Sequence, residues 1–340
     1  MPPKTPKVET LTWRELYAAA QRVQELKPWE MLDDLDLVVV RDPSSGQTGY
    51  GVFMGSGGEI FGYAVYRGSG GFSTYRNLID EKAEINNDNL LELLDCLKLE
   101  FGARSELQAE DLAVIRSLGL SFKGNHAWPG FRSFIPGYAP WFITEAEARF
   151  LTLCIQAGCY HFDRVNREEI DESFREGAYL VYSPAPDPPG FQSSWEKWPE
   201  DKPPAPVKPI LNLKAIEGLR SLTPDPHQSW EADVFLFPSQ ILEGDRPYFP
   251  RMGVVCHESS GIIVGTELSP PGQASSQLIV DLICSTAAKN GALPGALFVK
   301  GTAEEVALAP LAKMLGFTVR RRKRLGKIEK FRNAAMEGLR

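Results

Sequence analysis

Residues 252–268 read MGVVCHESSGIIVGTEL and form the clearest structural pattern in the C-terminal part of the chain. Mainly apolar and β-branched residues occupy 252–256 and 262–268, and the segment 257–261 between them is polar. That segment ends in Gly261, and glycine accepts the positive φ that tight turns require. The stretch therefore predicts a β-hairpin.

Sequence patterns on both sides of the hairpin predict alternating helices and strands. A helix at 213–222 and a strand at 230–237 are expected before it. After it we expect helices at 277–288, 303–315 and 328–339 and strands at 296–299 and 317–320. Three antiparallel strands followed by helix, strand, helix, strand and helix predict an α/β domain whose mixed sheet is covered by helices.

The N-terminal part predicts an α+β domain with an antiparallel meander. Short strands rich in Val and aromatic residues, separated by turn-forming residues, are expected at 37–41, 50–54 and 60–66. An amphipathic helix is expected from Thr10 or Thr12 to Lys27, where Pro28 stops it. A second helix starts at Thr144 with Glu147 completing a capping box, and 179–182 is expected as the last strand.

Two glycine-rich groups, 55–58 and 68–71, follow expected strands of this domain. Neither is followed by Lys-Ser/Thr, and neither is set in a strand-to-helix unit with dinucleotide-binding spacing. We therefore interpret both as tight turns and not as phosphate loops. The Trp-, Pro- and Gly-rich stretch 128–141 is interpreted as rigid connecting loops, with a binding surface of exposed aromatics as the alternative.

The segment 183–209 separates the two predicted domains. It holds nine of the 26 prolines together with Trp195 and Trp198. Because proline donates no backbone hydrogen bond, this segment is expected to be an extended linker or a strap on a domain surface. We therefore expect domains at 1–182 and 210–340.

Charge is distributed unequally along the chain. The whole chain has 37 basic and 44 acidic residues, a net charge of -7. Residues 210–340 carry 16 basic and 13 acidic residues, net +3, so the part before them has 21 basic and 31 acidic residues, net -10. No apolar run approaches the roughly 18 residues of a membrane span, and residues 1–9 lack the apolar core of a signal peptide. We expect a cytoplasmic protein without a membrane partner.

The five cysteines (Cys96, Cys154, Cys159, Cys256 and Cys284) lie in apolar surroundings without the spacing of a disulfide framework, which indicates buried, reduced thiols. Cys154, Cys159 and His161 form a Cys-x4-Cys-x-His group, but a fourth ligand is not nearby and structural zinc sites favour closer cysteine pairs. Ordinary core packing is therefore the preferred interpretation, and no metal or other cofactor is predicted.

The order of elements in the C-terminal domain resembles the ribonuclease-H-like fold of integrase cores and transposases. The likeness is carried by 230–233 (WEAD), 254–262 (VVCHESSGI) and 298–301 (FVKG). With 27–29 (KPW) and 136–141 (PGYAPW), the whole chain also resembles an uncharacterised bacterial family of unknown function. The first resemblance implies a scaffold, and the second implies no mechanism.

Enzymes of the ribonuclease-H-like fold hold two divalent ions between carboxylates. The resemblance places Asp233 at the carboxylate of the first strand, but Lys300 stands where the family carries its second Asp. Glu329, or Glu304 and Glu305 by a shifted alignment, are the candidates for the last acid. A cation at Lys300 repels metal ions, so the resemblance implies the scaffold without the reaction.

Cys256 and His257 form another pair that could suggest catalysis. A nucleophilic thiol needs a base within hydrogen-bonding distance, but neighbouring residues of a strand point to opposite faces. We therefore expect Cys256 in the core and His257 in the turn, with no catalytic role.

A basic segment follows the last expected strand. Residues 318–340 contain nine basic residues against Glu329 and Glu337. The candidate binding residues are Arg320, Arg321, Arg322, Lys323, Arg324, Lys327 and Lys330. They could contact a nucleic-acid backbone without sequence preference, or they could pair with acidic residues of the N-terminal part or form a solvated strand edge.

We therefore expect a non-catalytic binding protein whose partner is nucleic acid or another protein. The missing carboxylate and the charge asymmetry are the reasons for this hypothesis. A divergent metal-dependent nuclease using Asp233 and Glu329, and a pure protein-interaction module, are the alternatives.

Overall fold

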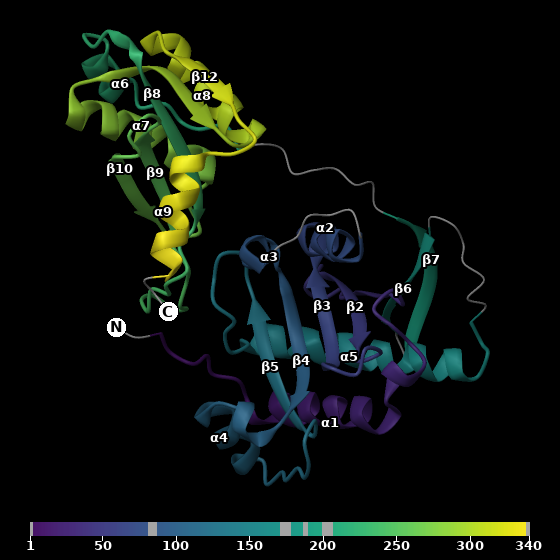
Figure 1. Ribbon diagram of the computed structural model, residues 1–340. Coiled ribbons are helices and arrows are strands. Elements are labelled where there is room, and N and C mark those ends of the chain that lie inside the picture. The colour runs from purple at the N-terminus through teal and green to yellow at the C-terminus, as the bar shows by residue number, and fades with distance from the viewer. Residues whose placement is uncertain (1–2, 81–86, 171–177, 186–189, 199–206, 338–340) are drawn as a thin grey trace. The chain divides into compact units, whose positions relative to one another are not determined.

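The computed structural model describes residues 3–80, 87–170, 178–185, 190–198 and 207–337. It divides into two compact units, residues 2–202 and residues 203–340, and each is described by itself (Figure 1). Both units combine one mixed sheet with helices. No described helix is both long enough and apolar enough to span a membrane.

The first unit is built on a seven-stranded sheet with the order β5-β4-β3-β2-β1-β6-β7. Its strands are β1 (Val38–Arg41), β2 (Thr48–Met54), β3 (Phe61–Arg67), β4 (Cys96–Gly102), β5 (Trp128–Phe134), β6 (Ala178–Pro184) and β7 (Phe191–Lys197). β1 to β5 pair antiparallel with their neighbours, which confirms the predicted meander. β1 pairs parallel with β6, so the sheet is mixed.

Helices cover both faces of this sheet. They are α1 (Thr10–Leu26), η1 (Pro28–Glu30), α2 (Gly68–Ile79), α3 (Asn87–Leu93), η2 (Arg104–Glu106), α4 (Ala109–Ser117) and α5 (Glu145–Asn166). α5 packs on β1, β2 and β3 with α1 against it, whereas α2 packs on β2 and β3 from the other face (Figure 1). The predicted capping box of α5 is confirmed, because the amide of Glu147 donates to Oγ1 of Thr144 and the amide of Thr144 donates to a Glu147 carboxylate oxygen.

Three sequence interpretations of this unit were wrong. The group 68–71 opens α2 directly after β3, although we interpreted it as a turn. The supposed loop 128–141 contains β5, which pairs with β4. Residues 191–197 of the supposed linker form β7 and pair with β6, because this stretch lies between the prolines and its amides are free to bond.

The second unit has a five-stranded mixed sheet with the order β10-β9-β8-β11-β12. Its elements are α6 (Leu213–Leu219), β8 (Pro224–Leu236), β9 (Arg251–His257), β10 (Ile263–Ser269), α7 (Ser275–Asn290), β11 (Leu293–Val299), α8 (Thr302–Leu315), β12 (Thr318–Arg321) and α9 (Gly326–Glu337). The predicted hairpin is confirmed as β9 and β10, and Gly261 in its turn has a φ of 75°. β8 pairs antiparallel with β9 and parallel with β11.

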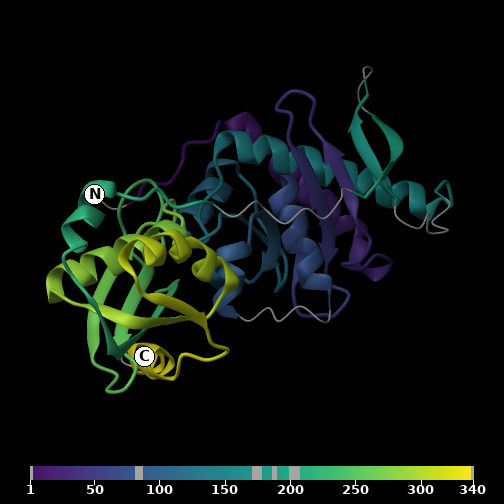
Figure 2. The same cartoon turned by 90° about the horizontal axis from the view of Figure 1, so that it is seen from above.

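The two faces of this sheet differ in their cover. One face packs against α6, α7 and α8 around a core that includes Trp230, Ile283 and Leu308. The other face carries α9 over a smaller core that includes Phe298 and Ile328. Figure 2 shows α7 and α8 on one side of the sheet and α9 on the other.

Candidate phosphate-binding surface

β8 directs two carboxylates toward the face that carries α9. Side chains alternate along a strand, and Trp230 and Ala232 belong to the core beneath α7 and α8. Glu231, Asp233 and Phe235 therefore point to the opposite face, where Phe235 joins the core under α9. The two acids stand two positions apart on one side of the same strand.

Glu231 fixes the start of α9. Its side chain is buried, and one carboxylate oxygen accepts hydrogen bonds from the backbone amides of Lys327 at 3.0 Å and Ile328 at 3.4 Å. The other oxygen lies 4.0 Å from the guanidinium of Arg322. Since the first amides of a helix have no partner within the helix and carry a partial positive charge, the buried carboxylate is compensated by α9 itself.

Asp233 has a different environment. It is half-buried, and among the described residues its carboxylate accepts one hydrogen bond, from the amide of Val234 at 3.0 Å. Burial raises its pKa to about 6, while the charges of Lys300 and Arg332 lower it and Glu304 raises it. This carboxylate is therefore poorly solvated and holds a proton more readily than an ordinary aspartate.

Lys300 lies near both candidate acids, Asp233 and Glu329. Its charge acts on the carboxylate of Asp233 and also contributes to the lowered pKa of Glu329. The larger cause of that lowered pKa is Arg324, whose guanidinium donates to Glu329 at 2.7 Å and 3.0 Å. The charge of Lys300 thus acts on both candidate acids, whereas neither acid affects the pKa of the other.

Glu304 is a further acid whose charge acts on Asp233. One of its carboxylate oxygens is buried and has no hydrogen-bond partner in the described part of the chain. Even so, the described residues contain no group of three or more His, Cys, Asp or Glu side chains that could hold a metal ion.

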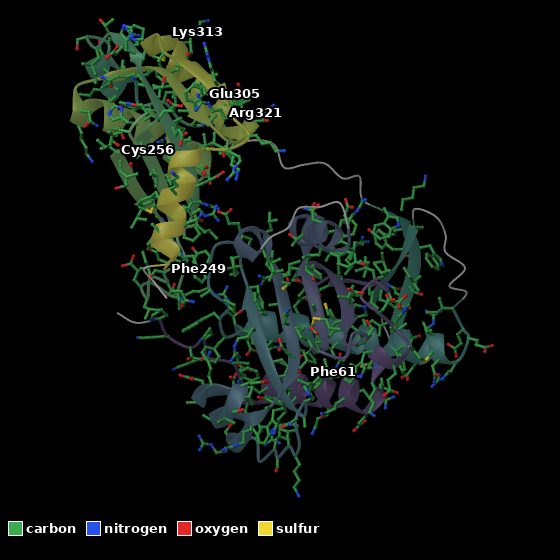
Figure 3. All side chains as sticks on the ribbon, viewed as in Figure 1. Phe61, Phe249, Cys256, Glu305, Lys313 and Arg321 are labelled. Carbon is green, nitrogen blue, oxygen red and sulfur yellow. The ribbon has the colours of Figure 1, made fainter. Side chains whose placement is uncertain are left out.

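The basic segment joins β12 to α9. Arg320, Arg321, Lys323, Arg324 and Lys330 are exposed, whereas Arg322 and Lys327 are half-buried. Arg321, at the end of β12 (Figure 3), donates to the hydroxyl of Thr302. The exposed guanidinium and ammonium groups form a positively charged surface, which we call the β12–α9 surface.

Arg322 is the structural member of this segment. Its guanidinium lies 3.3 Å from the centroid of the Phe298 ring and donates to Glu258 at 2.9 Å. Its backbone amide donates to the carbonyl of Val299. Stacking and a charged partner hold this side chain in place, so it anchors the segment.

The remaining sequence candidates lie in or against the cores. His257, expected in the turn, is the last residue of β9. Cys256 (Figure 3) is fully buried beneath α9, and burial raises the pKa of its thiol to about 11. The ring of His257 lies against Trp230 on the other face, so the two side chains do not pair. Cys154, Cys159 and His161 lie buried on α5, where Nδ1 of His161 hydrogen-bonds to the hydroxyl of Tyr182 at 2.8 Å.

Sequence reasoning missed a cavity of about 610 Å³ in the first unit. Its lining comes from the segment before β1, the second half of α2, α5 and the residues after it, β6, and β7 with the residue that follows it. Two of the lining residues, Trp195 and Trp198, were noticed only as part of the supposed linker. The cavity could not be predicted because β7 was not predicted, and the pairing of β7 with β6 brings the two indole rings to the cavity.

The fold defines a protein of two domains, each a mixed sheet covered by helices, with a basic surface on the second. Two domain families match the sequence. The domain of unknown function DUF7309 matches residues 13–182, and the domain of unknown function DUF6930 matches residues 215–336. The chain belongs to the DUF7309 family, which confirms the resemblance to an uncharacterised family. A search of curated proteins found no match.

Proposed function

We propose that the second unit is a non-catalytic, ribonuclease-H-like domain that binds the phosphate backbone of nucleic acid through its β12–α9 surface. The observation that carries the proposal is the exposure of Arg320, Arg321, Lys323, Arg324 and Lys330 on one short segment. Phosphate contacts by such side chains release counterions and require no base readout.

The sheet topology supports the choice of scaffold. Three antiparallel strands, β8, β9 and β10, are followed by α7, β11, α8, β12 and α9, and the last two strands run parallel to β8. The parallel strands end where Lys300 and the basic segment begin. In open α/β sheets, ligands bind beyond the carboxyl ends of parallel strands, so this edge is a suitable place for an anion.

The charges of the same edge favour binding over cleavage. Lys300 acts on the carboxylate of Asp233, and Arg324 holds Glu329. Two-metal cleavage requires several free carboxylates around adjacent ions. Cations placed among these acids neutralise them and at the same time attract phosphate.

The proposal is tested by replacing exposed cations of the surface together. We expect Arg320→Ala, Arg321→Ala, Lys323→Ala and Lys330→Ala, combined in one variant, to weaken binding of fluorescently labelled DNA or RNA about 100-fold. The slope of the logarithm of the binding constant against the logarithm of salt concentration should fall by about 3 for duplex DNA. Fluorescence anisotropy over a salt series measures both quantities.

The matched control removes the same charge elsewhere in the unit. Lys214, Arg220, Lys289 and Lys313 are exposed and lie outside the β12–α9 surface, so replacing them by Ala should leave most of the affinity intact. Equal losses in both quadruple variants would show a response to net charge only and would contradict the proposed surface. An unchanged affinity in the first variant would contradict it as well.

A further inference from the structure

The cavity of the first unit combines aromatic walls with an acidic side. Its volume of about 610 Å³ is in the range of cavities that hold small organic molecules. Its lining includes Asp36, Tyr75, Arg76, His161, Tyr179 and Trp195. These residues come from five separate segments of the unit, so the fold itself assembles the cavity.

Asp36 provides the acidic side. It precedes β1, and one of its carboxylate oxygens accepts a hydrogen bond from the amide of Asp33 at 2.7 Å. Burial raises the pKa of Asp36, and the neighbouring charges of Asp33 and Asp34 raise it further. A carboxylate that water solvates poorly and that has acidic neighbours is stabilised by a cationic partner.

The aromatic walls favour the same kind of ligand. Tyr75 and Tyr179 are almost fully buried, whereas Trp195 is 37% exposed. The packing of Tyr179 edge-on against Trp198, with ring centroids 5.6 Å apart, holds its ring in position. The faces of tyrosine and tryptophan rings attract organic cations and also pack well against apolar groups.

Two further polar residues define the remaining walls. His161 is 93% buried, since its relative exposure is 7%, and burial lowers its pKa to about 4, so its imidazole is neutral at physiological pH. Nδ1 bonds to Tyr182, and Nε2 has no hydrogen-bond partner among the described residues. The guanidinium of Arg76 lies over the Trp198 ring at 5.9 Å from its centroid.

We propose that this cavity binds a small organic amine with an aromatic body. The ammonium group pairs with Asp36, the aromatic body packs against Trp195 and Tyr179, and the neutral imidazole of His161 offers one further hydrogen bond. Asp33, Asp34 and Asp36 outnumber the cations Arg76, in the lining, and Arg164, whose charge acts on His161. This balance disfavours a carboxylate ligand. The proposal is independent of the phosphate-binding function, because every residue it uses belongs to the first unit.

Three probes with the same aromatic body test the charge preference. Phenethylamine, 2-phenylethanol and phenylacetate carry a positive, a neutral and a negative group on the same ring. We expect phenethylamine to bind the full chain about tenfold more tightly than either of the others, which equals about 1.4 kcal/mol. Isothermal titration calorimetry measures the affinities, and tryptophan fluorescence reports contact with the indole rings.

Two variants locate the binding. Asp36→Asn should reduce the affinity for phenethylamine to that for 2-phenylethanol, while Trp195→Ala should weaken all three probes. Glu59→Gln, which removes an equal charge from an exposed residue outside the lining, should change nothing. Thermal unfolding of each variant confirms that it is folded.

The proposal is overturned if phenylacetate or 2-phenylethanol binds as tightly as phenethylamine, or if none of the three binds. It is also overturned if Asp36→Asn, folded like the parent chain, keeps the preference for the amine.

Discussion

Glu231 and Asp233 lie on the same strand and the same face, yet their surroundings make them different groups. Glu231 is compensated by two amides at the start of α9, while Asp233 accepts one neighbouring amide and has a pKa raised to about 6. The first carboxylate therefore serves the structure of α9. The second is acted on by the charges of Lys300 and Arg332.

The largest effect is expected from removing the structural carboxylate. Glu231→Ala leaves the amides of Lys327 and Ile328 without their partner and should cost about 3 kcal/mol of unfolding free energy. Urea unfolding measures the cost, and hydrogen exchange at the two amides should become faster. Glu217→Ala, an exposed change in the same unit, is the control. A loss as small as that of the control would refute the anchoring role.

Replacing Asp233 should raise the unfolding free energy, whereas replacing Glu231 should lower it. Because its folded pKa of about 6 lies above the ordinary value of 3.8, it adds stability below about pH 4 that is lost as pH rises through 6. Asp233→Asn should therefore raise the unfolding free energy by about 2 kcal/mol near pH 8 and leave it nearly unchanged near pH 4. Urea unfolding at the two pH values checks this, and equal effects at both would contradict the raised pKa.

We expect the positive charge of Lys300 to oppose the binding of a metal ion beside Asp233. Lys300→Asp places a carboxylate near Asp233 and Glu304, so we expect Mn²⁺ to bind at least about tenfold more tightly than it binds the parent chain. Isothermal titration calorimetry measures the difference, with Lys300→Ala as the control that removes the cation without adding an acid. If both variants bind Mn²⁺ equally, the acids around Lys300 do not converge as we describe.

The smallest effect is expected at Glu329. Its carboxylate holds the guanidinium of Arg324, so Glu329→Gln should release a cation to the β12–α9 surface. The affinity for labelled nucleic acid should rise about threefold, and this increase should be larger at low salt. Anisotropy titrations measure this. A weaker affinity after the change would mean that the pair orients Arg324 for binding and does not withhold it.

Much of the second unit could be predicted from the sequence. The hairpin 252–268 combines β-branched runs with a glycine turn, and the helices α7 and α8 follow their apolar periodicity. The first unit was harder, because α2 begins in a glycine-rich group and β7 is a polar edge strand with exposed side chains. β7 lacks the alternation that identifies a half-buried strand, and the apolar stripe of α2 (Phe72, Tyr75 and Ile79) starts only after its glycines.

The sites were only partly predictable, because they depend on contacts between distant residues. The exposed cations of 320–330 could be recognised from composition alone. The hydrogen bond from the amide of Lys327 to Glu231 joins residues 96 positions apart, so no local sequence pattern predicts it. The aromatic cavity depends on the pairing of β7 with β6. This pairing was not predicted because the prolines on both sides of β7 indicated a linker.

Anisotropy of labelled single-stranded and double-stranded DNA and RNA, with and without Mn²⁺, tests the central claim most directly. The same samples are then run on a denaturing gel. We predict binding that weakens steeply with salt, does not depend on Mn²⁺ and leaves every strand intact. Cleavage that appears with Mn²⁺ and is abolished by Asp233→Asn would contradict a non-catalytic domain, and the absence of binding at low salt would contradict a phosphate-binding surface.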